Sequence, residues 1–130
     1  MPQDTVYNIY WDEQNNWITM EWDGYATSAQ FIEGTELMYR LMVEHKTSKV
    51  FADIKDMTLI GREDQSYVIY SFLPRAIQAG FRAIAIVKPV SYFNAVAIET
   101  MGYRVNETAV QMKVFDNRDE AIRWLRETQV

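Results

Sequence analysis

Two runs of aromatic and β-branched residues open the chain, Val6–Trp11 and Trp17–Trp22, and the polar stretch 12–16 separates them. Two such runs joined by a short polar turn predict a β-hairpin. Alternate side chains of a strand point to opposite faces, and one alternating set of the second run is entirely apolar. We expect this set to face the core: Ile18, Met20 and Trp22.

A helical repeat follows the hairpin. Apolar side chains recur three and four residues apart over Phe31–His45, the spacing of a helix with one buried face. Thr27 or Ser28 is suited to cap its start. Glu36 and Arg40 are four residues apart, and this spacing predicts an ion pair on the exposed side.

The middle of the chain predicts a strand, a loop and a second helix. Lys49–Ile54 is the strand, and Lys55–Gly61 is the loop. The helix is expected to start near Arg62, to be kinked or divided at Pro74, and to stop at Gly80.

The apolar run Ala83–Val87 predicts a strand covered on both faces. A helix capped by Ser91 is expected to reach Met101 and to stop at Gly102, with residues 103–110 as a loop. The last strand is Gln111–Phe115.

Asn117 is suited to cap the final helix, with Glu120 completing a capping box. The element order is therefore ββαβαβαβα. Strands that alternate with helices form parallel sheets with right-handed crossovers. We predict one α/β domain over residues 1–130, with a single mixed, mostly parallel sheet and an N-terminal antiparallel hairpin.

Composition and charge exclude several classes of function. The chain has 130 residues, 48% hydrophobic and 24% charged, which is typical of one globular domain. A net charge of −5 argues against nucleic-acid binding. The N-terminal sequence lacks the features of a signal peptide, no apolar run reaches the roughly 20 residues of a membrane span, and cysteine is absent. A cytoplasmic location is the expectation.

The negative charge is concentrated at the start of the chain. Residues 1–30 hold no Lys or Arg, whereas residues 31–130 carry equal numbers of acids and bases. A partner of this region is expected to be apolar with basic residues at its rim. The acids and tryptophans of the region are Asp4, Asp12, Glu13, Glu21, Asp23, Trp11, Trp17 and Trp22.

Several short landmarks then resemble those of small bacterial proteins of the STAS-like, anti-sigma-factor-antagonist-like (SpoIIAA-like) family, many of them uncharacterised. The resemblance runs from about residue 6 to 127. Its landmarks are Glu21–Tyr25, Phe51–Ile54, Leu73–Ala76 with Gly80, Ala83–Val87 with Pro89, and Val114–Asp116 leading into Glu120–Leu125.

The resemblance implies a non-enzymatic regulatory or protein-binding domain. Such antagonists are switched by phosphorylation within a motif of Asp-Leu-Ser followed by Asp-Ser-Ser-Gly. Here Asp53–Lys55 matches the start, but Gly61–Glu63 stands near the place of the Asp-Ser-Ser triplet. The phospho-switch motif is therefore not retained, and Thr58 and Ser66 are the nearest hydroxyls.

Candidate binding residues follow from position. Asp53 and Asp56 come at the carboxyl end of a predicted parallel strand, where ligands of open α/β sheets bind. They are candidates for acid–base chemistry, although turn hydrogen bonding and solvation explain them more simply. Thr58 and Arg62 flank the next helix start, where free N–H groups attract anions. Arg75, next to Pro74, is a further candidate or a surface charge.

Two aromatic residues are candidates for a partner surface. If Ile18, Met20 and Trp22 face the core, Trp17 faces away from it, and Tyr10 is a second candidate. An exposed aromatic cluster marks an interface with a protein partner or with a second copy of the chain, as in a homodimer, unless another element covers it.

No cofactor, metal or catalytic constellation is indicated. His45 is the sole histidine and suits the end of its helix. The alternative function is a carrier of a small hydrophobic ligand, because CRAL-TRIO lipid-transfer domains are similar in sheet topology and an apolar pocket between helices and sheet would suit an acyl or aromatic molecule.

Overall fold

The computed structural model describes residues 6–130 and contains one five-stranded sheet. The strands lie in sequence order, β1 to β5. β1 pairs antiparallel with β2, and all other neighbours are parallel, as predicted. The strands are β1 (Tyr7–Asp12), β2 (Trp17–Gly24), β3 (Lys49–Met57), β4 (Ala83–Val87) and β5 (Gln111–Phe115).

The helices follow the predicted order as well. Each parallel pair of strands is joined by a helical crossover, and α5 closes the chain. The helical segments are α1 (Ser28–His45), α2 (Arg62–Tyr67), the π-helical turn η1 (Val68–Phe72), α3 (Leu73–Gln78), α4 (Tyr92–Val105) and α5 (Arg118–Glu127).

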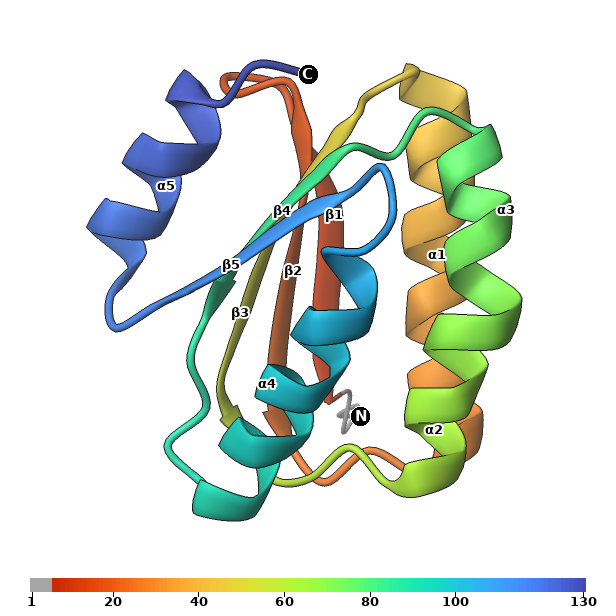
Figure 1. Cartoon of the computed structure of the whole chain (residues 1–130), viewed down its shortest axis with the longest axis vertical. Helices are drawn as coiled ribbons and strands as arrows, with labels where there is room; N and C mark the ends of the chain where they lie inside the picture. Colours follow the sequence, from red (N-terminus) through yellow and green to blue (C-terminus); the bar gives the residue numbers. More distant parts are fainter. Residues whose placement is uncertain (1–5) are drawn as a thin grey trace, which may run out of the picture.

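The helices divide unequally between the two faces of the sheet (Figure 1). Right-handed crossovers that always step to the next strand in the same direction place every crossover helix on one face. α1, the α2–α3 segment and α4 therefore share one face, and among residues 6–130 only α5 covers the other. Two separate apolar clusters result, one on each side of the sheet.

Trp17 belongs to the smaller cluster, beneath α5. Its side chain is 1% exposed and packs with Phe51, Ala85 and Leu125. The expectation that Trp17 lies on a partner-binding surface is therefore wrong, because α5 supplies the cover that this face needs. Its indole N–H has no hydrogen-bond partner in the described part of the chain.

The remaining aromatic side chains of the hairpin are also largely packed. Trp22 is buried against Phe31, and Trp11 stacks on His45 with 4.3 Å between ring centroids. Tyr10, on the edge strand, is 40% exposed. The hairpin therefore presents no exposed cluster of aromatic residues in the described part of the chain.

α1 begins at the Thr27 cap that the sequence predicts, with a full capping box formed by Gln30. Glu36 does not pair with Arg40. Arg75 of α3 holds it instead, with Nη1 donating to Glu36 Oε1 at 3.0 Å, and Tyr67 donates to the same carboxylate. The Arg75 hydrogen bond lowers the pKa of Glu36. Arg75 therefore links α3 to α1.

Two elements run further than predicted. β3 continues to Met57 rather than ending at Ile54, because residues 56 and 57 still pair with β2. α4 passes through Gly102 to Val105, so residues 103–105 are helical and not loop. Glycine ends a helix only where the backbone turns left-handed, and among the described glycines Gly24 and Gly80 do so.

The helix predicted to be kinked or divided at Pro74 keeps a helical backbone from α2 into α3 but changes its hydrogen bonding just before that residue. In the π-helical turn η1 the N–H of Leu73 donates to the carbonyl of Val68 five residues back. Proline has no N–H and its ring conflicts with the carbonyl four residues earlier, so a wider turn before Pro74 relieves the conflict. The sequence expectations that involve Asp4 and the extreme N-terminus lie outside the described residues.

Candidate functional site

The structure brings Asp53 and Asp56 into one shallow polar hollow of about 310 Å³, at the carboxyl ends of β2 and β3. Arg118, the first residue of α5, reaches into it. Its Nη1 donates to Asp53 Oδ2 at 2.6 Å, and its Nη2 donates to Glu21 Oε2 at 3.3 Å. Asp53 also accepts the N–H of Lys55 at 3.1 Å. The carboxylate of Asp53 is thus held by structural partners, and Asp56 is exposed.

The other predicted polar residues do not join this hollow. Thr58 is exposed in the loop after β3, where its N–H donates to the carbonyl of Gly24 at 2.9 Å. Arg62 lies at the start of α2, on the opposite side of the sheet from α5. Arg75 is held by Glu36 and lies over the ring of Tyr39 at 5.0 Å.

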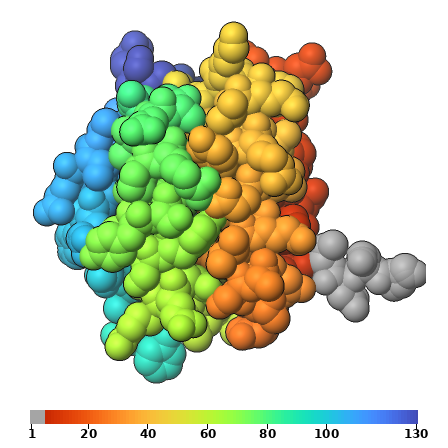
Figure 2. Space-filling view, turned by 90° about the vertical axis from the view of Figure 1, so that its right-hand side faces the viewer, coloured from red at the N-terminus to blue at the C-terminus, as the bar shows by residue number. Residues whose placement is uncertain are grey.

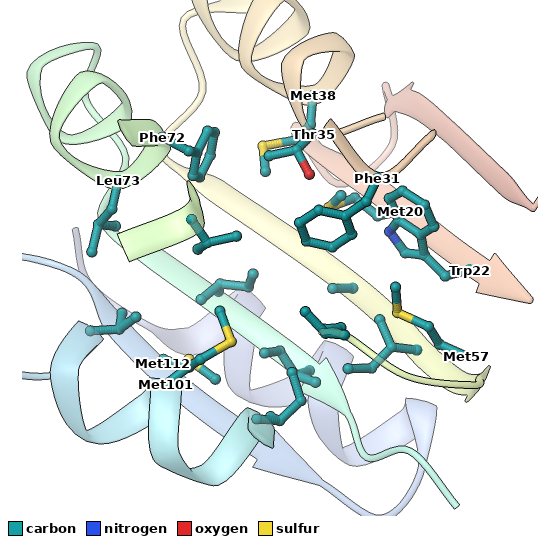
Figure 3. A pocket seen from close by; sticks show the side chains of 18 of the residues that line it. Met20, Trp22, Phe31, Thr35, Met38, Met57, Phe72, Leu73, Met101 and Met112 are labelled. Carbon is teal, nitrogen blue, oxygen red and sulfur yellow. The ribbon is translucent and has the colours of Figure 1, made fainter. Parts of the chain in front are cut away.

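The most distinctive feature is an apolar cavity of about 110 Å³ between the sheet and the helices of the crowded face. Figure 3 shows side chains from the strands, α1, the η1–α3 turn and α4 arranged around it. Every described lining residue other than Thr35 is aliphatic, aromatic or methionine: Met20, Trp22, Phe31, Met38, Ala52, Ile54, Met57, Ile60, Val68, Phe72, Leu73, Phe81, Ile84, Ile86, Ile98, Met101, Val105 and Met112.

Methionine is concentrated around this cavity. The chain has seven methionines, and five of them line it, namely Met20, Met38, Met57, Met101 and Met112. Methionine is unbranched and polarizable, and it adapts its shape to whatever it contacts. A methionine-rich wall therefore allows the cavity to accommodate ligands of more than one shape.

Asn94 fixes the end of the cavity nearest the carboxyl edge of the sheet. It is fully buried in the first turn of α4, and sequence analysis did not single it out. Its Oδ1 accepts the N–H of Ile60 at 3.0 Å, and its Nδ2 donates to the carbonyl of Met57 at 3.3 Å. Ile60 and Met57 both line the cavity, so Asn94 positions its wall.

We expect Asn94→Ala to lower the free energy of unfolding by about 1–3 kcal/mol, because it leaves a buried N–H and a buried carbonyl without partners. Asn106→Ala is the matched control. Asn106 makes the same double contact, with the backbone of Met112, but it is exposed and water can replace it. Urea unfolding of both variants measures the difference, and equal losses would contradict the role given to Asn94.

Neither a metal site nor a membrane span stands out in the described part of the chain. No group of three or more His, Asp or Glu residues there is placed to hold a metal ion. None of the helices of residues 6–130 combines the length and the apolar character that crossing a bilayer requires.

The family model described as SpoIIAA-like matches residues 17–126. Among solved structures, an uncharacterised DUF3478-family protein of Shewanella loihica PV-4, described as having a SpoIIAA-like fold, is similar with a TM-score of 0.60. The two share 15% identity over 96% of this chain and 98% of that chain, so the likeness concerns the fold. A search of curated proteins found no match.

Proposed function

This chain belongs to the SpoIIAA-like family, and we propose that it is a non-enzymatic binding domain that takes one small apolar molecule into the cavity between its sheet and helices. The observation that carries the proposal is the cavity itself. Protein interiors are ordinarily packed as densely as organic crystals, so space of this size beneath three helical segments calls for an occupant.

The lining decides the chemistry of that occupant. Water in a cavity needs two to four polar partners, and Thr35 and the indole N–H of Trp22 are the polar side-chain groups among the described lining residues. Water is therefore a poor occupant. An apolar cavity of roughly 150 Å³ in an engineered protein core binds benzene, which sets the scale for a single ring or a short acyl chain here.

The expected affinity is modest. Burial of about six carbon atoms at roughly 0.8 kcal/mol each gives about 5 kcal/mol, which corresponds to a Kd on the order of 0.1–1 mM. Ligand-observed NMR with benzene and 1-hexanol measures binding in this range. Native mass spectrometry of the purified protein tests for a tighter, co-purified molecule. Absence of binding by both methods would overturn the proposal.

An exposed apolar surface favours a second candidate function, contact with another protein. We call it the α4 surface: Leu59, Val90, Tyr92, Phe93 and Val96. Val90, Tyr92 and Phe93 are 78%, 74% and 76% exposed, and the start of α4 projects at the lower end of Figure 2. Exposed clusters of aromatic and aliphatic side chains mark interaction sites.

A second copy of the chain is the partner that we assign to the α4 surface. Lys55 and Asp56 are adjacent and exposed close to it, since the carbonyl of Lys55 accepts the N–H of Val90 at 3.1 Å. A two-fold interface brings the same patch of both copies together, so charges of both signs at its edge suit self-contact.

Sedimentation velocity over a concentration series tests whether the α4 surface mediates self-association. Phe93→Ser should weaken association and Tyr103→Ser, at the other end of α4, should not; a monomer at every concentration would contradict it.

The regulatory role and the cytoplasmic location that the sequence suggests stay predictions. An acid–base role for Asp53 gains no support from its contacts, since Arg118 and a backbone N–H occupy its oxygen atoms.

A further inference from the structure

A groove runs beside the cavity between the α2–η1 segment and α4. It has a volume of about 150 Å³ and is open to solvent. Two of its residues are arginines, Arg62 from α2 and Arg104 from α4. Its other lining residues are Gln65, Ser66, Ile69, Tyr70, Thr100 and Met101.

Met101 separates the groove from the cavity, because its side chain lines both. Leu73 of α3 likewise lines both the cavity and a second groove. Met101 has three rotatable side-chain bonds, so it can turn aside without movement of the backbone. A turn of the Met101 side chain would therefore connect the groove with the cavity.

The two arginines are not held in ion pairs by the described residues, although the Tyr70 hydroxyl and, to a smaller extent, the charge of Glu107 raise the pKa of Arg104. Arg104 Nη2 donates to the hydroxyl of Tyr70 at 2.8 Å, and its guanidinium lies 5.3 Å from the centre of that ring. Neither Arg62 nor Arg104 forms an ion pair within residues 6–130. The acids closest along the chain are Glu63 and Asp64 beside Arg62, and Glu107 beyond Arg104.

We propose, on the basis of the proposed function, that the ligand is an amphipathic carboxylic acid. Its apolar tail occupies the cavity, and its carboxylate lies in the groove and accepts hydrogen bonds from Arg104 and Arg62. Arg62 and Arg104 line the same groove, and Met101 belongs both to that groove and to the lining of the apolar cavity, so a carboxylate can be bound in the groove while its tail lies in the cavity. Arginine matches the planar shape of a carboxylate with paired N–H donors.

Hexanoate and 1-hexanol distinguish this inference from the proposed function, because they share a six-carbon tail and differ in the head group. Titration calorimetry at low salt and pH 7 is expected to give hexanoate at least tenfold tighter binding than 1-hexanol. The double variant Arg62→Gln, Arg104→Gln should remove that preference and leave the affinity for 1-hexanol unchanged. Arg123→Gln on α5 is the control, since it removes an exposed arginine far from the groove.

Equal affinity of the wild-type protein for both compounds would overturn the head-group inference and leave the proposed function standing. The same holds if Arg123→Gln weakens hexanoate binding as much as the double variant does. Failure of both compounds to bind would overturn the proposed function and the inference together.

Discussion

Replacing Ala52 with leucine is expected to abolish the binding of benzene and 1-hexanol while leaving the fold at least as stable as the wild type. Ala52 is buried in the middle of β3 and lines the cavity. Leucine adds three carbon atoms that occupy the space a ligand would use. Because these atoms enter a vacancy, we expect the free energy of unfolding to be unchanged or to rise by about 1 kcal/mol. Ligand-observed NMR and urea unfolding measure the two effects.

Ala85→Leu is the matched control for this substitution. Ala85 is equally buried on the neighbouring strand β4, but its side chain points to the opposite face, beneath α5. Ala85 is fully buried in that cluster, so leucine must displace its neighbours. We expect the free energy of unfolding to fall by about 1–3 kcal/mol. Equal destabilisation by both substitutions would show that the cavity face is as densely packed as the α5 face, and the binding proposal would fall.

Trp17→Ala is expected to lower the free energy of unfolding by about 3–5 kcal/mol, the largest loss predicted for any single substitution here. Trp17 is one of the largest fully buried side chains, and it fills the space between β2 and α5. Within the described part of the chain α5 is the sole helix on this face, and its inward residues include Ala121 and Leu125. Removal of the indole therefore leaves a void that the helix is too constrained to fill.

Tyr10→Ala provides the comparison for Trp17→Ala. Tyr10 is half-exposed on the edge strand, and we expect its replacement to cost less than about 1 kcal/mol. Thermal and urea unfolding of both variants test the contrast. A small effect of Trp17→Ala would mean that α5 does not cover this face in solution, and would restore Trp17 as a surface residue.

The order of elements was predictable because local signals and periodicity agree over most of the chain. Caps form at Thr27, one of the two residues predicted for the first helix, and at Ser91 and Asn117. The capping box predicted with Glu120 is only half made among the described hydrogen bonds, because the Glu120 N–H donates to Asn117 without a return bond from the Glu120 side chain. The prediction failed at Gly102, where a helix packed on the sheet carries on through a glycine whose backbone stays helical. Tertiary packing outweighs the modest helical cost of glycine at such a position.

Strand alternation alone could not predict that the side chain of Trp17 is buried. Alternation assigns side chains to two faces, but it does not say whether each face is covered. The missing information lay at the far end of the chain, in the apolar positions of α5, more than 100 residues away. Large separations along the chain, 97 and 65 residues, likewise hid the ion pairs of Arg118 with Glu21 and Asp53.

The sequence predicts that an apolar pocket can form between the helices and the sheet, but not which residues line it. An apolar pocket between helices and sheet follows from the topology, but its size depends on how side chains pack, and sequence does not encode that locally. The joint position of Arg62 and Arg104 in one groove is likewise a property of the folded surface. The number of methionines, seven in 130 residues, is the sequence feature that relates to the cavity, since five of them line it.

The central claim is that an apolar molecule enters the space enclosed by the methionine-rich wall. The direct measurement is an NMR titration with benzene of protein carrying ¹³C-labelled methionine methyl groups. The methyl resonances of Met20, Met38, Met57, Met101 and Met112 should shift together and saturate. Met42 is fully buried in the same core yet does not line the cavity, so its resonance should stay in place. Stationary resonances throughout, or a Met42 shift equal to the others, would contradict the account.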